Sequence, residues 1–198
     1  KPPVRTKNVL NKDQLVAVET IATMSPGTAL LHGVTGSGKT WVYIAAVETT
    51  IASGRSVIVL VPEIALTAQL VKNFSEHFED VILTHSKQTE AERHQAWLDA
   101  LTSDRPRVII GPRSALFMPL ADIGLIIIDE CHEPSYKQEQ SPRFSALRVA
   151  STLVAEFSAK AIFGSATPSV SDYFVAEHSK RPIISLPKLA RHDAVSPT

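Results

Sequence analysis

Short apolar runs alternate with longer amphipathic stretches along most of the chain. Six runs rich in Val, Ile and Leu lack an apolar–polar alternation, which is typical of parallel strands buried on both faces. They cover residues 28–31, 56–61, 81–84, 108–110, 125–128 and 161–163. Helix-like segments occupy residues 12–23, 39–52, 64–78, 90–101 and 146–155. This order predicts an α/β fold, with an open, mostly parallel sheet, right-handed crossovers and helices on both faces.

The remaining segments are expected to be loops and tails. Residues 112–124 and 133–144 carry neither helical nor strand periodicity. Residues 1–9 are interpreted as a linker or tail, residues 10–190 as one domain, and residues 191–198 as the start of another linker. No internal repeat or low-complexity segment interrupts the domain.

Composition narrows the class of protein. With 198 residues, 44% of them hydrophobic and 20% charged, the chain can fold as one soluble domain with a sizeable core. Lys plus Arg and Asp plus Glu both number 20, which argues against a strongly basic nucleic-acid coat but leaves room for a local basic track. The single cysteine, Cys131, excludes a disulfide framework and a cysteine-based zinc site within this chain. No signal-peptide or membrane-span pattern is visible, so a cytoplasmic location without a membrane partner is expected.

A glycine-rich loop supplies the strongest chemical signal. Residues 33–40 match the pattern G-x-x-x-x-G-K-[ST] completely, between a predicted strand and a predicted helix. Glycines let backbone N–H groups turn toward phosphate oxygens, and the helix N-terminus adds positive potential. Lys39 is expected to neutralise the β- and γ-phosphates of ATP, and the Thr40 hydroxyl to ligate Mg²⁺. The predicted nucleotide-binding residues of this loop are Gly33, Thr35, Gly36, Ser37, Gly38, Lys39 and Thr40.

Acidic residues follow the most apolar run directly, in the order Asp129, Glu130, Cys131 and His132. In an open parallel sheet, ligands bind at the edge where the strands end. Asp129 is therefore predicted to anchor Mg²⁺ together with Thr40, and Glu130 to orient and deprotonate an attacking water. Cys131 is interpreted as a packing residue, because no partner His–Asn or His–Asp arrangement lies nearby.

These motifs resemble those of superfamily 2 helicases. Residues 33–40 resemble motif I, residues 129–132 resemble motif II of the DExH type, and residues 164–169 resemble motif III. Four further segments narrow the resemblance to the primosomal protein N′ family of replication-restart DNA helicases: residues 60–67, 84–86, 111–117 and 135–138. The resemblance extends from about residue 10 to residue 190, and it departs from the family pattern at Pro112, Cys131 and residues 147–148.

The resemblance implies a RecA-like P-loop NTPase lobe, the first of two. It implies an ATP-dependent 3′–5′ DNA helicase that acts in replication restart at stalled forks. Gln14 would then read adenine, His132 would join the catalytic set, and Ser165, Ala166 and Thr167 would couple the ATP state to DNA. A second RecA-like lobe, expected after residues 191–198, would supply a catalytic arginine. The chain alone is therefore expected to bind nucleotide but to hydrolyse it weakly or not at all.

The same resemblance implies the partners of the parent protein. They are single-stranded and forked DNA, primosome proteins and single-strand-binding proteins, in the nucleoid region of the cytoplasm. Zinc is expected only in another part of the parent protein.

The DNA contacts are expected at loop ends, which would hold the strand backbone without reading sequence. The segment 136–144 interleaves aromatic rings with Lys137 and Arg143, so it either stacks on a base or wedges the fork, or it is an ordinary loop packed by Tyr136 and Phe144. Both interpretations stay open on composition alone. The candidate residues for DNA contact are Pro62, Glu63, Thr67, Thr84, His85, Ser86, Arg113, Ser114, Tyr136, Lys137 and Gln138.

Two other classes of protein share the phosphate loop. A P-loop kinase or small GTPase-like switch would need a lid or a guanine-reading [NT]KxD sequence, and neither is found. A DNA- or protein-interaction module with a relic phosphate loop would not need Lys39, Thr40, Asp129 and Glu130, all of which are intact.

Overall fold

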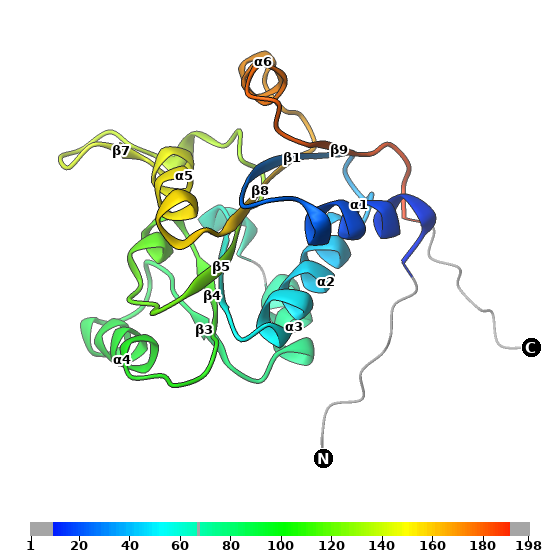
Figure 1. The fold of residues 1–198 in the computed structure, drawn as a ribbon. Helices are drawn as coiled ribbons and strands as arrows, with labels where there is room; N and C mark the ends of the chain where they lie inside the picture. Colours follow the sequence, from blue (N-terminus) through cyan, green and yellow to red (C-terminus); the bar gives the residue numbers. More distant parts are fainter. Residues whose placement is uncertain (1–9, 67, 191–198) are drawn as a thin grey trace, which may run out of the picture.

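A seven-stranded sheet forms the centre of the molecule in the computed structural model, which describes residues 10–66 and 68–190 (Figure 1). Its strands follow the order β3-β4-β2-β5-β8-β1-β9, and every neighbouring pair is parallel. Each of the six predicted apolar runs falls in one of these strands, so the predicted α/β fold with an open parallel sheet is confirmed. The strands are β1 (Gly27–Gly33), β2 (Ser56–Leu60), β3 (Val81–Leu83), β4 (Val108–Gly111), β5 (Ile123–Ile128), β8 (Lys160–Ser165) and β9 (Ile183–Leu186).

Helices connect the strands and cover both faces of the sheet (Figure 1). α1, α4 and α6 each begin with a capping box, in which a polar side chain and the residue three positions later satisfy each other's backbone N–H groups. Short 3₁₀ helices span Glu63–Ala65, Arg113–Phe117 and Pro134–Tyr136. The helices are α1 (Lys12–Thr23), α2 (Lys39–Ala52), α3 (Ala68–His77), α4 (Glu90–Leu101), α5 (Ala146–Phe157) and α6 (Val170–His178).

Two hydrophobic cores lie on opposite faces of the sheet. In β2, Val57 and Val59 face a core shared with α1, α2 and α3, whereas Ile58 and Leu60 face a core shared with α4 and α5. All four side chains are at most 1% exposed, and burying one such side chain contributes about 1.5–3 kcal/mol. Because the strands have apolar side chains on both faces, their sequence shows no alternation.

The structure corrects two expectations about local elements. The helix predicted over residues 64–78 is divided: a 3₁₀ helix at Glu63–Ala65 precedes α3, which begins at Ala68. The loop predicted over residues 133–144 contains an antiparallel hairpin of β6 (Lys137–Gln138) and β7 (Phe144–Ser145). The predicted tails at residues 1–9 and 191–198 lie outside the described residues. Within the described part of the chain, no helix is long and apolar enough to cross a bilayer.

The amino-terminal edge of the sheet is fastened by Arg55. Its guanidinium group pairs with the Asp122 carboxylate at 2.9 Å and donates to the carbonyl oxygens of Ile123 and Phe157, each at 2.6 Å. Arg55 thereby joins the start of β2, the start of β5 and the end of α5. The opposite, carboxyl edge of the same sheet carries the residues that the sequence predicts to bind nucleotide and DNA.

Candidate nucleotide and nucleic-acid site

The strand order brings the three sequence motifs together. β5, β8 and β1 are consecutive in the sheet, so the segments that follow them lie side by side at its carboxyl edge. These segments are residues 129–132, residues 165–167 and the phosphate loop at residues 33–40. The ends of β2, β4 and β3 continue the edge on the other side of β5. The carboxyl edge therefore has two halves, which we call the nucleotide half (β5, β8, β1) and the open half (β2, β4, β3).

The phosphate loop adopts a conformation that depends on its glycines. Gly36 and Gly38 have φ values of 77° and 81°, in the left-handed region that glycine reaches without strain. A Cβ atom on Gly38 would lie 2.3 Å from Nε2 of Gln14, and one on Gly33 would lie 2.6 Å from Oγ of Ser37. Gly33 and Gly38 therefore leave no room for a side chain.

Lys39 begins α2 and lies against the loop. The side chain is largely buried, and its Nζ donates to the Gly33 carbonyl oxygen at 3.0 Å and pairs with the Glu130 carboxylate at 3.4 Å. Among the described residues, the buried hydroxyl of Ser37 has no hydrogen-bond partner. A buried ammonium group beside an unpaired hydroxyl at a helix N-terminus suits an anionic ligand such as a phosphate chain.

Asp129 lies at the end of β5 and is held by two tyrosines. The hydroxyl of Tyr43 in α2 donates to Oδ1 of Asp129 at 2.9 Å, and the hydroxyl of Tyr136 donates to its carbonyl oxygen at 2.7 Å. Burial raises the pKa of the Asp129 carboxyl group, and the hydrogen bond from Tyr43 opposes that shift. Burial also raises the pKa of Tyr43 well above its ordinary value, so this hydroxyl remains a donor. A Cβ atom on Gly164 would lie 1.8 Å from the Tyr43 hydroxyl, so β8 can pass here only with a glycine.

Glu130 lies between the phosphate loop and the segment after β8. Its φ value of 47° is in the left-handed region, which costs a non-glycine residue on the order of 1 kcal/mol or more. One carboxylate oxygen pairs with Lys39, and the other accepts from the Ala166 N–H at 3.3 Å. The strained backbone therefore aims a carboxylate at the place where the other two motifs meet.

His132 connects the acidic segment to residues 165–167. Its Nδ1 and the Ser165 hydroxyl are 2.8 Å apart, and the same hydroxyl accepts from the Thr167 N–H at 3.0 Å. The Nδ1 atom also lies 3.6 Å from the Glu130 carboxylate. The intervening Cys131 is 5% exposed within the core, where burial raises the pKa of its thiol to about 12, so the packing interpretation is confirmed.

Gln14 contacts the phosphate loop from α1. It is 3% exposed; its Nε2 donates to the Ser37 carbonyl oxygen at 3.0 Å, and its Oε1 accepts from the Asn11 N–H at 2.9 Å. Both ends of the amide are thus bonded within the chain. In this structure Gln14 supports the shape of the loop, and its amide keeps a second N–H and a second lone pair, so adenine reading by Gln14 stays a prediction.

Together, these residues fit a nucleotide with a divalent cation. The loop offers backbone N–H groups, the Lys39 ammonium group and an unpaired Ser37 hydroxyl, which suit phosphate oxygens. The hydroxyl of Thr40 and the carboxylate of Asp129 are hard oxygen ligands, which Mg²⁺ prefers.

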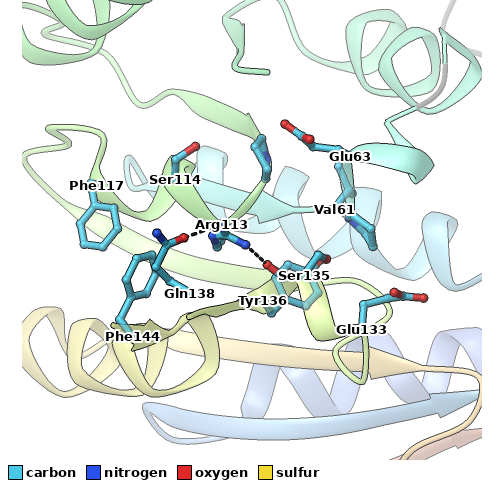
Figure 2. A pocket seen from close by; sticks show the side chains of 12 residues that line it. Val61, Glu63, Arg113, Ser114, Phe117, Glu133, Ser135, Tyr136, Gln138 and Phe144 are labelled. Carbon is cyan, nitrogen blue, oxygen red and sulfur yellow. Dashed lines mark hydrogen bonds between the residues drawn. The ribbon is translucent and has the colours of Figure 1, made fainter. Parts of the chain in front are cut away.

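The open half contains a pocket of about 480 Å³ at the ends of β2 and β4 (Figure 2). Six of the residues predicted to contact DNA line it: Pro62, Glu63, Arg113, Ser114, Tyr136 and Gln138. Thr84, His85 and Ser86 follow β3 and are not among its lining residues, and Lys137 lines a neighbouring hollow with Arg113. Thr67 lies outside the described residues. The pocket is completed by Val61, Pro112, Phe117, Glu133, Ser135 and Phe144.

Arg113 and Tyr136 have different surroundings from those that sequence reasoning suggested. The Arg113 guanidinium group donates to the Ser135 carbonyl oxygen at 2.5 Å and to Oε1 of Gln138 (Figure 2). Arg113 therefore joins the 3₁₀ helix at Pro134–Tyr136 and the hairpin to the segment after β4. Tyr136 is 1% exposed, and stacking its ring on a base would require it to leave the core. The prediction of base stacking is therefore wrong for Tyr136, and the packed-loop interpretation describes it.

Sequence reasoning did not select Phe117 as a site residue. Its ring meets that of Phe144 edge to face, with centroids 5.2 Å apart, and Phe117 is 57% exposed (Figure 2). The pair borders the pocket from two distant segments, so only the position of Phe117 after a strand end could have signalled its role.

Comparison with known proteins assigns the family. The sequence matches the DEAD/DEAH box helicase family over residues 11–173. The chain belongs to this family. Its DEAD/DEAH segment here reads Asp129, Glu130, Cys131 and His132, with the contacts described above.

The predicted resemblance to replication-restart DNA helicases is confirmed by relatives with curated names. The chain is 42% identical to replication restart protein PriA of Bacillus subtilis (strain 168), over 82% of this chain and 20% of that protein. It is 43% identical to PriA of Chlamydia trachomatis serovar D, over 91% of this chain and 25% of that protein. The chain thus spans between a fifth and a quarter of the length of these relatives.

Solved helicase structures share the fold of this family member. RecG bound to a three-way DNA junction superposes with a TM-score of 0.66 at 21% identity, over 94% of this chain and 25% of that chain. The helicase MrfA bound to DNA gives a TM-score of 0.62 at 17% identity, over 93% of this chain and 28% of that chain. At these identities the likeness concerns the fold, and the predicted RecA-like lobe is confirmed.

Proposed function

We propose that the chain is the ATP-binding motor lobe of an ATP-dependent 3′–5′ DNA helicase that acts in replication restart at stalled forks. One observation carries this proposal: Glu130 contacts both Lys39 of the phosphate loop and Ala166 of the segment after β8. A carboxylate in this position can respond to a terminal phosphate and to movement of a neighbouring segment. The relatives named replication restart protein PriA support the biological setting.

The residues of the nucleotide half have distinct roles in this proposal. The loop N–H groups and Lys39 hold the phosphate chain, and Thr40 and Asp129 hold Mg²⁺. The bound Mg²⁺ neutralises developing negative charge on the phosphates. Glu130 orients a water for in-line attack and accepts its proton. His132 links Glu130 to the segment after β8, because its Nδ1 atom and the Ser165 hydroxyl are hydrogen-bonded at 2.8 Å.

The open half is proposed to hold the backbone of single-stranded or forked DNA. Contacts to phosphate and sugar carry no sequence information, which suits an enzyme that must move along any strand. Groups at the ends of β2, β3 and β4 would make these contacts, and Arg113 would hold the loop beside them. The proposed contact residues are Pro62, Glu63, Thr67, Thr84, His85, Ser86, Ser114, Lys137 and Gln138.

Other parts of the helicase are proposed to lie outside this chain. A second RecA-like lobe would supply an arginine to the terminal phosphate, so this chain alone binds nucleotide and turns it over weakly. Primosome and single-strand-binding proteins are the proposed partners in the nucleoid region of the cytoplasm, and any zinc would belong to the rest of the parent protein.

ATP affinity provides the test. Lys39→Ala should weaken Mg²⁺–ATP binding by at least about tenfold, because it removes a charge-assisted bond of roughly 1.5–3 kcal/mol. Lys72→Ala is the matched control, since Lys72 lies in an exposed ion pair with Glu76 on α3. Equal affinity of the wild type and Lys39→Ala would favour a relic phosphate loop. In the full protein, hydrolysis that single-stranded DNA does not stimulate would contradict the helicase assignment.

A further inference from the structure

His32 and Tyr173 form a contact that the proposed chemistry does not use. His32 is the residue of β1 directly before Gly33, and Tyr173 lies in α6. The Tyr173 hydroxyl and Nδ1 of His32 form a hydrogen bond. Their rings also meet edge to face, with centroids 5.6 Å apart. The strand that carries the phosphate loop is thereby joined to a helix whose role is otherwise unexplained.

The helix α6 has little apolar packing against the rest of the lobe. Within α6 only Ala176 is buried, whereas Val170 and Phe174 are 87% and 64% exposed. Apolar packing therefore contributes little to holding the helix, in contrast to α2, in which five hydrophobic residues are buried. A polar bond at the end of β1 is a large share of what attaches α6 to the sheet.

The contact between His32 and Tyr173 completes a ring of bonded residues around the nucleotide half. Lys39 bonds to Gly33 and pairs with Glu130; Glu130 accepts from Ala166 in the segment after β8. That segment continues through Ser169, the N-cap of α6, and α6 returns to the phosphate loop through Tyr173 and His32. The segment 165–167 therefore reaches the loop by two routes, one through Glu130 and one through α6.

We propose that His32 and Tyr173 are positioning residues that transmit displacements of residues 165–167 to the phosphate loop. The proposal rests on the function proposed above and on the coupling of residues 165–167 to DNA that the resemblance implies. Neither side chain needs to touch nucleotide: His32 acts through Gly33, and Tyr173 acts through α6. Without the bond, the loop would bind ATP normally but would respond poorly to DNA.

The decisive variant is Tyr173→Phe in the full protein, because it keeps the ring and removes only the hydroxyl. The DNA-stimulated kcat should fall by about three- to tenfold, the range that corresponds to one net hydrogen bond, while KM for ATP and the rate without DNA stay within about twofold. Phe174→Leu, on the exposed side of the same helix, is the matched control and should leave all three quantities unchanged. His32→Asn retains a polar group near the position of Nδ1 and should keep most of the stimulation, whereas His32→Leu should reproduce Tyr173→Phe.

Hydrogen exchange separates this inference from the helicase assignment. In Tyr173→Phe the amides of residues 33–38 should exchange faster than in the wild type, because the end of β1 has lost its attachment to α6. Phe174→Leu should leave this exchange unchanged. If the wild type lacked DNA-stimulated hydrolysis, the proposed function would fail and the exchange measurement would still decide the linkage. Unchanged exchange of residues 33–38 in Tyr173→Phe would overturn the inference, whatever the rates.

Discussion

The two halves of the carboxyl edge are built differently. In the nucleotide half, the side chains of Lys39, Glu130 and His132 bond to one another, to the Gly33 backbone or to the Ser165 hydroxyl, over distances of 2.8–3.6 Å. In the open half, a pocket of about 480 Å³ separates the ends of β2 and β4 from the hairpin. Its rim carries the exposed ring of Phe117 and the exposed side chain of Glu63.

The difference corresponds to two physical tasks. Charge development in a transferring phosphoryl group is stabilised best by groups that are already oriented, so a bonded network suits the nucleotide half. A strand that slides past the lobe must be gripped and released repeatedly, so the open half needs hollows and loops rather than a fixed network. The hydrogen bonds of Arg113 show how the second half keeps its loops in place without filling the space.

The largest effect should come from Glu130→Gln. The amide keeps the size of the side chain but cannot take a proton, so DNA-stimulated hydrolysis by the full protein should fall by about 10²–10⁴-fold. ATP affinity should change by less than about threefold. Glu139→Gln, in the exposed hairpin beside the open half, is the matched control, and it should keep hydrolysis within about threefold of the wild type. If both variants lost activity equally, the separation of the two halves would be untenable.

The second-largest effect should come from Gly164→Ala, which should lower both the stability and the ATP affinity of the nucleotide half. The new Cβ would lie 1.8 Å from the Tyr43 hydroxyl, so the variant should lose about 1–3 kcal/mol of unfolding free energy in denaturant titrations. Displacing Tyr43 also frees the Asp129 carboxylate, so Mg²⁺–ATP affinity should fall. The double variant with Tyr43→Phe should recover part of the lost stability.

Gly111→Ala provides the comparison in the open half. Its Cβ would lie 2.0 Å from the Thr84 hydroxyl and 2.8 Å from the Thr84 carbonyl oxygen, so stability should fall here too. ATP affinity, measured below the melting temperature, should be unchanged. An equal loss of ATP affinity in Gly111→Ala and Gly164→Ala would show that the two halves form one unit.

Substitution of Arg113 should have a smaller effect, and it should change DNA binding alone. Arg113→Ala and Arg113→Lys should both weaken single-strand binding by about three- to tenfold, because lysine cannot bridge two acceptors as the guanidinium group does. The slope of log affinity against log salt should stay constant if Arg113 only holds the loop. A decrease of about 1 in that slope would instead identify a phosphate contact. Arg93→Ala, in the exposed face of α4, is the control.

The smallest effect should be that of Asp129→Asn on the protein without nucleotide, which this substitution should stabilise. Burial raises the pKa of Asp129, so the ionised carboxylate costs stability above that pKa and the cost vanishes below it. The melting temperature at pH 8 should therefore rise by roughly 1–4 °C, and the gain should shrink as the pH is lowered through the raised pKa toward the ordinary value of 3.8. Asp99→Asn, on the surface of α4, should show no such gain. A lower melting temperature for Asp129→Asn would contradict the prediction.

The sequence predicts the nucleotide half better than the open half for a physical reason. The phosphate loop and the acidic segment are contiguous motifs beside apolar runs, so their place at strand ends follows from local patterns. β9 and α6 escaped prediction. β9 is four residues long, and its place depends on pairing with β1 and on burial of Ile184 and Leu186 in the core. The burial of Tyr136 also depends on contacts that local composition does not encode.

Side-chain partners across the sheet could not be predicted either. Tyr43 and Asp129 are 86 positions apart, and His32 and Tyr173 are 141 positions apart. Such pairs depend on strand order, and the order β5-β8-β1 cannot be deduced from the alternation of helices and strands alone. The role of Gln14 as a support for the loop was hidden for the same reason.

Gln14 also sets a boundary for any shortened version of this lobe. Its amide closes the capping box of α1 and holds the Ser37 carbonyl oxygen, so the first helix and the phosphate loop order together. A fragment that began at Gly27 would retain all seven strands of the sheet, yet its loop would lose this support. A fragment that begins at residue 10 is therefore expected to bind nucleotide more tightly than one that begins at Gly27.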